Sequence, residues 1–208
     1  MTDRYQVGGA EGQFESGSGD KVLANKLGIV DPDEMDDLES RLLEDLYESV
    51  LLRDFPDRRL CVVDLKTWHR RWLGNVYRWA GEERSVNLTK GDFPFAAAAR
   101  IGSLLGKFEE ECLGELTPCH GLGEEALINA IAVTHVEFIL IHPFREGNGR
   151  LSRLLADVMA VQAGRDPMDY SGWKADLEGY FAAIQHGMAG DYGPMRSYVR
   201  HALSARDS

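Results

Sequence analysis

The sequence is poor in cysteine, has no long hydrophobic run and carries no excess of basic residues. Its three cysteines are widely spaced and form no C-x-x-C pair, which argues against a disulfide framework or a zinc site and for a cytoplasmic location. No apolar stretch approaches the roughly 20 residues that cross a bilayer. The polar, glycine-rich start of the chain has none of the apolar core of a signal peptide.

The charge balance excludes partners that are large polyanions. Lys and Arg number 23 against 34 Asp and Glu, so the net charge is −11. We therefore expect neither a nucleic acid nor a membrane as partner, because both attract a broad basic surface. This balance still permits one local basic pocket for a small anion. With 208 residues, 44% of them hydrophobic, the chain is long enough for one domain with its own core.

Apolar periodicity predicts a mainly α fold with one hairpin. Residues 1–19 are predicted to form a polar N-terminal arm, and residues 20–203 a single domain. Asp31 followed by proline predicts a helix start, and Asp64 is the expected cap of a second helix. The helices expected after the first cover residues 60–79, 96–113, 124–141, 150–163, 177–184 and 193–203.

The segment Ser85–Phe95 interrupts the helical pattern. Its first four residues alternate polar and apolar, and Lys90-Gly91-Asp92 supplies turn residues. This pattern predicts a short β-hairpin or extended flap. The residues of the flap that we expect to matter are Ser85, Val86, Asn87, Leu88, Thr89, Lys90 and Gly91.

The stretch from His142 to Arg153, HPFREGNGRLSR, concentrates the residues that carry chemistry. Gly147-Asn148-Gly149 precedes a predicted helix, so successive backbone N–H groups can point into one concavity. The start of that helix adds unpaired N–H groups and a partial positive charge. Arg150 and Arg153 are three residues apart on the first turn and share a face. Together these features predict a polyphosphate site.

Three further side chains in this stretch suggest how the phosphate would react. A carboxylate at Glu146 would repel phosphates unless a cation lay between them, and Mg²⁺ binds one or two carboxylates together with substrate phosphates. His142, with an ordinary pKa near neutrality, is the candidate general base, and Phe144 is expected to anchor the loop. Each feature alone has an ordinary structural explanation, and only the combination indicates displacement at phosphorus.

These twelve residues match, without departure, the signature H-x-F-x-[D/E]-G-N-G-R-x-x-R, and on this motif the chain resembles the Fic (filamentation induced by cAMP) family. The complete motif distinguishes it from the kinase-like Doc branch. The resemblance extends over roughly residues 20–200. Outside the motif it is carried by Asn25–Ile29, Val76–Glu82, Val86–Gly91, Tyr180 and Gly190–Tyr192.

The resemblance implies an all-α core with a β-hairpin flap over the active site. It also implies transfer of AMP from ATP to a Ser, Thr or Tyr hydroxyl of a target protein, with release of pyrophosphate. By matching position, His142 is the base and Glu146 holds Mg²⁺ between the α- and β-phosphates. The flap would dock the target by β-augmentation. The phosphates would be bound by Gly147, Asn148, Gly149, Arg150 and Arg153.

The chain lacks a complete match to the inhibitory motif of Fic enzymes, and this predicts how the protein is regulated. Many Fic enzymes have an inhibitory helix with the pattern [S/T]-x-x-x-E-[G/N], whose glutamate pairs with the second arginine, here Arg153. The nearest match is Ser40–Asp45, in which Asp45 replaces the Gly or Asn. Glu44 is accordingly interpreted as a solvated residue. We expect the toxin half of a toxin–antitoxin pair, inhibited by a separate small antitoxin protein.

Three alternative functions remain at this level. The first is a Fic-fold kinase or another nucleotide-derived transferase, and the second is a catalytically silent nucleotide-binding module. The third is a metal-dependent nuclease using His135, Glu137 and His142. The net charge of −11 disfavours a nuclease, and His135 is better interpreted as a core-facing helix residue.

Overall fold

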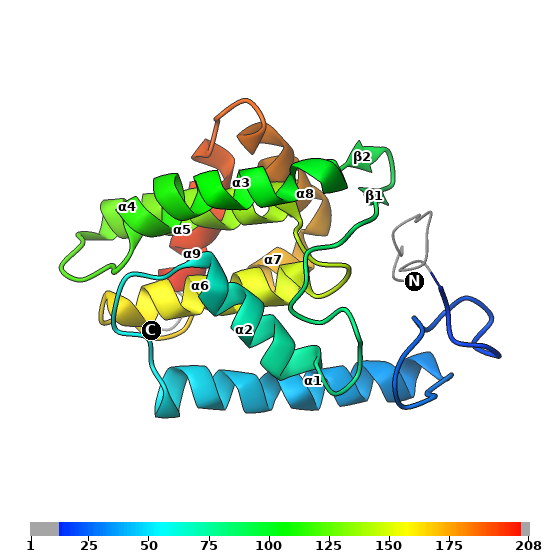
Figure 1. The fold of residues 1–208 in the computed structure, drawn as a ribbon. Coiled ribbons are helices and arrows are strands. Elements are labelled where there is room, and N and C mark those ends of the chain that lie inside the picture. The colour runs from blue at the N-terminus through cyan, green and yellow to red at the C-terminus, as the bar shows by residue number, and fades with distance from the viewer. Residues whose placement is uncertain (1–12, 205–208) are drawn as a thin grey trace.

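The computed structural model describes residues 13–204, which form a mainly helical fold with a two-stranded hairpin (Figure 1). Of the N-terminal arm predicted for residues 1–19, residues 1–12 lie outside the described part, and the single domain predicted for 20–203 stays a prediction. The elements are α1 (Pro32–Glu48), η2 (Ser49–Arg53), α2 (Val62–Leu73), β1 (Thr89–Lys90), β2 (Phe93–Pro94), η3 (Ala98–Arg100), α3 (Ile101–Phe108), η4 (Glu109–Leu113), α4 (Gly114–Leu116), α5 (Glu124–Ile141), α6 (Asn148–Gln162), α7 (Ser171–Ala175), α8 (Leu177–Gly187) and α9 (Gly193–Ser204).

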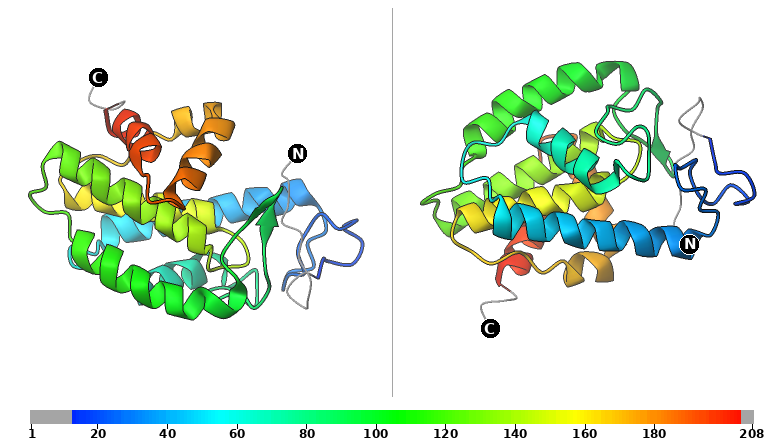
Figure 2. Two further views of the ribbon diagram at one scale, coloured as in Figure 1. Left: turned by 90° about the horizontal axis from the view of Figure 1, so that it is seen from above. Right: turned by 60° about the horizontal axis from the view of Figure 1, so that its bottom comes forward.

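Helix α5 is the centre of the core. It contacts α3, α6, α8 and α9, while α2 bridges α1 to α6 (Figures 1 and 2). Buried side chains lie on every side of α5, as expected for a helix that is apolar all round. The structure confirms the bounds predicted for this helix, residues 124–141. Among residues 13–204, no helix is both long and apolar enough to cross a membrane.

The starts of α1 and α2 show how the sequence caps its helices. The side chain of Asp31 caps α1, as predicted: its carboxylate accepts from the N–H groups of Asp33 and Glu34. The cap predicted for α2 was wrong. Cys61 occupies that position, and Asp64 lies three residues further on, where its carboxylate accepts from the Cys61 N–H at 2.9 Å. The helix also ends at Leu73, six residues before the predicted Trp79, because a series of turns follows.

The predicted flap is a short antiparallel hairpin at one end of the molecule (Figure 1). Thr89 pairs with Pro94 and Lys90 with Phe93, around a turn that begins with Gly91 at a φ of 55°. Residues 85–88 precede the strand as irregular chain. The hairpin therefore begins later than the alternation suggested.

Candidate active site

His142 is held at the end of α5 in a left-handed backbone conformation. Its φ and ψ are 50° and 60°, and its N–H donates to the carbonyl of Phe138 at 3.0 Å. Pro143 then prevents the helix from continuing. A non-glycine residue rarely adopts a positive φ, and such conformations concentrate at functional sites. The backbone alone therefore marks this histidine as unusual.

The side chain of His142 lies beneath the flap. His142 is 3% exposed and stacks on Phe95 at 3.7 Å between ring centroids. Its Nδ1–H donates to the carbonyl of Ile139 at 3.2 Å, which leaves the lone pair on Nε2. Burial lowers the pKa of His142 to about 3, assisted by the positive charges of Arg84 and Lys90. The ring is thus neutral at pH 7, the form that can accept a proton.

The loop after His142 is closed on itself by Asn148. The Asn148 amide donates to the carbonyl of Phe144 at 2.8 Å and accepts from the Phe144 N–H at 2.9 Å. This buried side chain is engaged within the loop, so the backbone N–H of Asn148 is its group best placed to bind a phosphate. The buried ring of Phe144 stacks on His69 of α2 at 4.0 Å. Both side chains thus fix the shape of the loop.

Gly147 makes the turn from this loop into α6. It has a φ of 82°, and a Cβ at this position would lie only 2.6 Å from the ring of Trp72. Both the conformation and the close approach therefore require glycine. The turn leaves the first N–H groups of α6 without intrahelical partners, and the helix dipole adds positive character there. The geometry is that of an anion site.

Two buried residues that the sequence analysis did not single out support the loop. His69 accepts from the N–H of Gly81 at 2.8 Å, and its Nε2–H donates to the carbonyl of Glu146 at 3.0 Å. Arg84 donates to the carbonyl of His142 at 2.7 Å, to that of Val86 in the flap, and to that of Ala96 directly after the flap at 2.6 Å. It thereby joins the flap to the end of α5. The sequence features that could have identified them are the position of His69 on the apolar face of a predicted helix and that of Arg84 directly before the flap.

Glu146 presents a carboxylate at the mouth of the loop. Its side chain is 28% exposed, and its Oε1 accepts from the N–H of Gly147 at 3.0 Å and lies 4.0 Å from Arg150. The second oxygen, Oε2, has no hydrogen bond with any of the described residues. A single accessible carboxylate fits Mg²⁺, which takes most of its ligands from phosphates and water.

The two arginines of α6 differ in how they are held. Arg150 Nη2 donates to Oε2 of Glu39, a buried carboxylate of α1, at 2.6 Å, and its guanidinium lies 4.6 Å from the ring centroid of Trp72. Arg153 lies 5.8 Å from the ring centroid of Tyr170 and forms no ion pair or hydrogen bond through its guanidinium with residues 13–204. Arg153 is therefore available to an anion from outside.

The nearest acidic residue along α6, Asp157, forms no ion pair or hydrogen bond with the Arg153 guanidinium among residues 13–204, although the positive charge of Arg153 acts to lower the pKa of Asp157. Asp157 accepts from the hydroxyl of Tyr47 at 3.1 Å and from that of Tyr170 at 2.9 Å. Burial raises the pKa of Asp157 to about 6, against the effect of these hydrogen bonds. On α1, Glu44 is exposed, in agreement with its interpretation as a solvated residue.

The different surroundings of the two arginines predict different effects on stability. Arg150→Ala should lower the free energy of unfolding by about 3 kcal/mol, because it leaves Glu39 buried without its partner. Arg153→Ala should cost about 1 kcal/mol or less, the value of its aromatic contact. Urea unfolding of both variants measures the difference, and equal losses would contradict it. Adding Glu39→Gln to Arg150→Ala should recover part of the loss, since the amide can still accept from Tyr77.

The residues of the nuclease alternative are occupied in other contacts. His135 is buried in the core, as predicted, with its Nε2 hydrogen-bonded to the hydroxyl of Tyr180 at 2.8 Å. Glu137 accepts from the hydroxyl of Tyr192 at 2.6 Å. In residues 13–204 there is no group of three or more His, Cys, Asp or Glu side chains that could hold a metal ion. These contacts leave His142 without the two partners that the alternative requires.

A cleft of about 450 Å³ opens between the flap and α8. The aromatic rings of Phe93, Phe95 and Phe181 contribute to its walls, and Lys90 Nζ lies 3.7 Å from the ring centroid of Phe181. Because Phe95 also stacks on His142, this cleft adjoins the candidate base.

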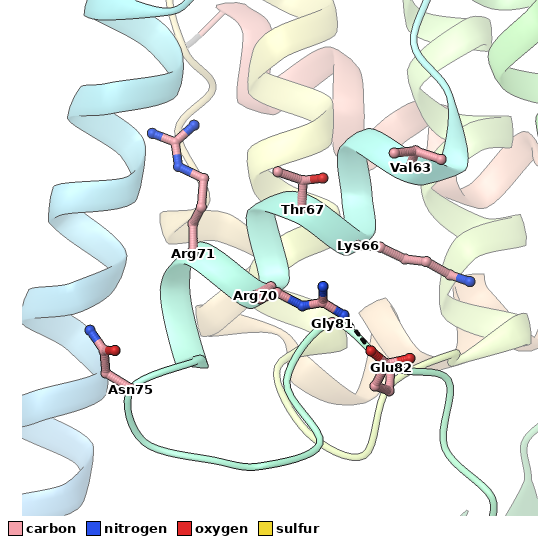
Figure 3. A pocket seen from close by; sticks show the side chains of 8 residues that line it. All are labelled: Val63, Lys66, Thr67, Arg70, Arg71, Asn75, Gly81 and Glu82. Atoms are coloured by element: carbon pink, nitrogen blue, oxygen red, sulfur yellow. Dashed lines mark hydrogen bonds and ion pairs between the residues drawn. The ribbon is translucent and has the colours of Figure 1, made fainter.

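A separate hollow of about 600 Å³ lies on the exposed face of α2 (Figure 3). Its cations already have acidic partners. Lys66 Nζ lies 2.7 Å from Glu83, and Arg70 pairs with Glu82. The third cation, Arg71, lies 3.5 Å from an aspartate of the loop after η2. The guanidinium of Arg153, which has no ion pair within residues 13–204, is therefore a better candidate for the anion site than this hollow.

Comparison with known proteins assigns the chain to a family. Residues 59–160 match the Fic/DOC family. The probable protein adenylyltransferase Fic of Escherichia coli is 32% identical over 144 residues, which cover 67% of this chain and 68% of that protein. The chain belongs to the Fic/DOC family. The probable protein adenylyltransferase y4lH of Sinorhizobium fredii is 26% identical to this Fic protein over 185 residues, 89% of this chain and 93% of the relative.

Solved structures confirm the Fic fold. The crystal structure of the Bartonella tribocorum effector BepC with bound AMPPNP has a TM-score of 0.71 at 22% identity, covering 91% of this chain and 94% of that one. A Fic domain of Bartonella quintana with bound ADP has a TM-score of 0.71 at 24% identity, covering 91% and 92%. The mainly α fold with a hairpin flap is thereby confirmed.

Proposed function

We propose that this Fic protein is a Mg²⁺-dependent protein adenylyltransferase that transfers AMP from ATP to a hydroxyl side chain of a target protein. One observation carries the proposal: a neutral histidine begins a loop that ends at an open helix N-terminus, with Arg153 unpaired among residues 13–204. The relatives named above are called probable protein adenylyltransferases, which supports the same reaction.

The residues of this chain supply a base and a phosphate cradle. The hydroxyl oxygen of the target attacks the α-phosphorus of ATP and forms the new P–O bond, while its proton passes to Nε2 of His142. The bond from the α-phosphorus to the bridging oxygen breaks, and pyrophosphate leaves with the electron pair. The turn formed by Gly147, Asn148 and Gly149 cradles the phosphates. The N–H of Gly147 donates to Glu146, so the backbone N–H groups of Asn148 and Gly149 bind the phosphates, and Arg150 and Arg153 hold the β- and γ-phosphates.

Glu146 would hold the magnesium ion. Its exposed carboxylate is an oxygen donor of the kind that Mg²⁺ prefers, and it stands beside the cradle. When bound, the ion supplies positive charge that neutralises the phosphates. In its absence, the Glu146 carboxylate would repel the nucleotide that the neighbouring arginines attract.

The flap positions the nucleoside of ATP and the segment of the target protein. The nucleoside end of ATP enters the cleft between the flap and α8, where aromatic side chains offer faces for a base to stack on. The target segment adds to the backbone of the flap, residues Ser85 to Gly91, as an extended strand. This mode of docking positions a hydroxyl without selecting a particular side-chain sequence, since main-chain groups supply the hydrogen bonds.

The position of a radioactive label in ATP tests the proposed reaction. Incubation of the protein and a cell lysate with α-labelled ATP should label protein, whereas γ-labelled ATP should label none, because the γ-phosphate leaves with pyrophosphate. Labelling is counted only where it exceeds that of the same lysate without the protein, because kinases of the lysate also transfer the γ-phosphate. Mass spectrometry of the labelled proteins should then find added AMP. Label transferred only from the γ-position would support the kinase alternative and exclude AMP transfer.

A separate antitoxin protein would inhibit the enzyme through Arg153. We propose that the antitoxin supplies a carboxylate to this arginine, which has no acidic partner in residues 13–204. Such a carboxylate would occupy the place of the γ-phosphate. Expression of the protein alone should arrest growth, and co-expression with the adjacent reading frame should relieve the arrest. Equal arrest in both cultures would refute the toxin–antitoxin role while leaving the enzymatic proposal intact.

A further inference from the structure

A glutamate of α1 lies directly behind the phosphate site. Glu39 occupies the buried face of the helix, and its side chain is 4% exposed. Three contacts fix it: Oε2 accepts from Arg150 at 2.6 Å, Oε1 accepts from the hydroxyl of Tyr77 at 2.7 Å, and its backbone carbonyl accepts from Trp72 Nε1 at 2.9 Å. Helix α1 precedes residues 59–160, which match the family. This contact therefore joins a residue outside residues 59–160 to one inside them.

The contact leaves most of Arg150 open. A guanidinium has five N–H donors, and Glu39 takes one of them. The face of the guanidinium packs on Trp72, while its side chain is still 26% exposed and lies 4.0 Å from Glu146. Glu39 therefore holds Arg150 from the buried side, and the donors on its exposed side remain for a ligand.

We propose that Glu39 is a positioning residue that presets Arg150 for the β-phosphate of ATP, an inference that rests on the proposed function. An arginine carries several rotatable bonds, and ordering them on binding reduces affinity. Because Glu39 and Trp72 already order Arg150, its side chain loses this conformational entropy on folding and not on binding of the nucleotide. A role as a brake would require Glu39 to compete for the phosphate-binding side of Arg150, but both of its carboxylate oxygens are bound on the buried side.

Two nucleotides that differ in their phosphates separate positioning from general damage. AMPPNP has the β-phosphate that Arg150 would hold, and AMP lacks it. In the presence of Mg²⁺, Glu39→Gln should weaken AMPPNP binding about tenfold, the loss of one well-positioned charged contact. AMP binding should stay within twofold of wild type. In the transfer assay, KM for ATP should rise while kcat at saturating ATP falls less than threefold.

Matched variants identify the contact responsible. Tyr77→Phe removes the other hydrogen bond to the Glu39 carboxylate but keeps the pair with Arg150, so it should bind both nucleotides as wild type does. Glu39→Asp keeps the charge but withdraws the carboxylate by one methylene, so it should repeat the selective loss of AMPPNP affinity. In an Arg150→Lys background, Glu39→Gln should add no further loss.

Several results would overturn the inference. Unchanged AMPPNP binding in Glu39→Gln would show that Arg150 needs no preset partner. Tighter binding or faster transfer would show that Glu39 restrains Arg150 instead. Equal weakening of AMP and AMPPNP in both Glu39 variants would show a purely structural role. A wild-type protein that binds neither nucleotide would refute the proposed function itself, whereas one that transfers AMP but ignores Glu39→Gln would refute this inference alone.

Discussion

Replacement of His142 by alanine is expected to slow AMP transfer on the order of 10³-fold, the usual contribution of a well-placed general base. The neutral ring holds a proton on Nδ1, so Nε2 is the atom that accepts the hydroxyl proton. Alanine offers no acceptor there. The phosphates are bound by other groups, so the affinity for AMPPNP should change less than threefold. Single-turnover transfer of α-label and direct binding of AMPPNP measure the two effects separately.

A second variant guards against loss of the fold. His142 has a positive φ, which asparagine tolerates better than alanine. His142→Asn should therefore keep the wild-type stability more closely while losing transfer to a similar extent. Undiminished labelling by both variants would remove His142 from its role as base. A parallel loss of AMPPNP binding and transfer would instead assign it to the shape of the loop.

The parts of the fold that could be predicted are those governed by local pattern. The central helix α5 is apolar enough for its full length to be found, and α6 was predicted to within two residues at its start because glycine marks the turn. The motif places His142 and Glu146 in the loop before α6 and Arg153 on the first turns of that helix, because the three are close in sequence. No long-range pairing was needed to place them together.

The parts that could not be predicted depend on distant contacts. Glu39 lies on the buried face of an ordinary amphipathic helix, and only the packing of α1 against α2 and α6 brings it to Arg150. Arg84 supports both the flap and the end of α5, although nearly sixty residues separate it from His142. Short elements were also missed, since the five-residue helix α7 is too brief for periodicity to reveal.

The protein is expected to lose stability steeply as the pH falls below 6.5, because three buried histidines are neutral in the folded state. Burial lowers the pKa of His142 and of His135 to about 3, and that of His69 to about 4. The unfolded chain protonates all three near their ordinary pKa of 6.5, so unfolding takes up protons below that pH. Each such proton changes the free energy of unfolding by about 1.4 kcal/mol per pH unit.

One buried carboxylate partly offsets the effect of the histidines on how the free energy of unfolding depends on pH. Burial raises the pKa of Asp157 from 3.8 to about 6, so between these values the folded state binds this proton more tightly than the unfolded chain. The net uptake on unfolding between pH 6 and pH 4 is then two protons, and stability should fall by roughly 3 kcal/mol per pH unit. Domains are commonly stable by about 5–15 kcal/mol, so a loss of roughly 6 kcal/mol between pH 6 and pH 4 removes a large part of that stability.

Urea unfolding at pH 7, 6 and 5 measures this slope, and substitutions identify its source. His135→Gln removes one of the three groups and should reduce the slope by about 1.4 kcal/mol per pH unit, whatever it does to stability at pH 7. His201→Gln, a substitution on the exposed face of α9, is the control for replacing a histidine outside the core. A stability independent of pH between 7 and 5 would mean that the histidines are accessible to protons in the folded state. In that case, much of the His142 population would be protonated at pH 6, and a smaller fraction would be in the neutral form that accepts a proton.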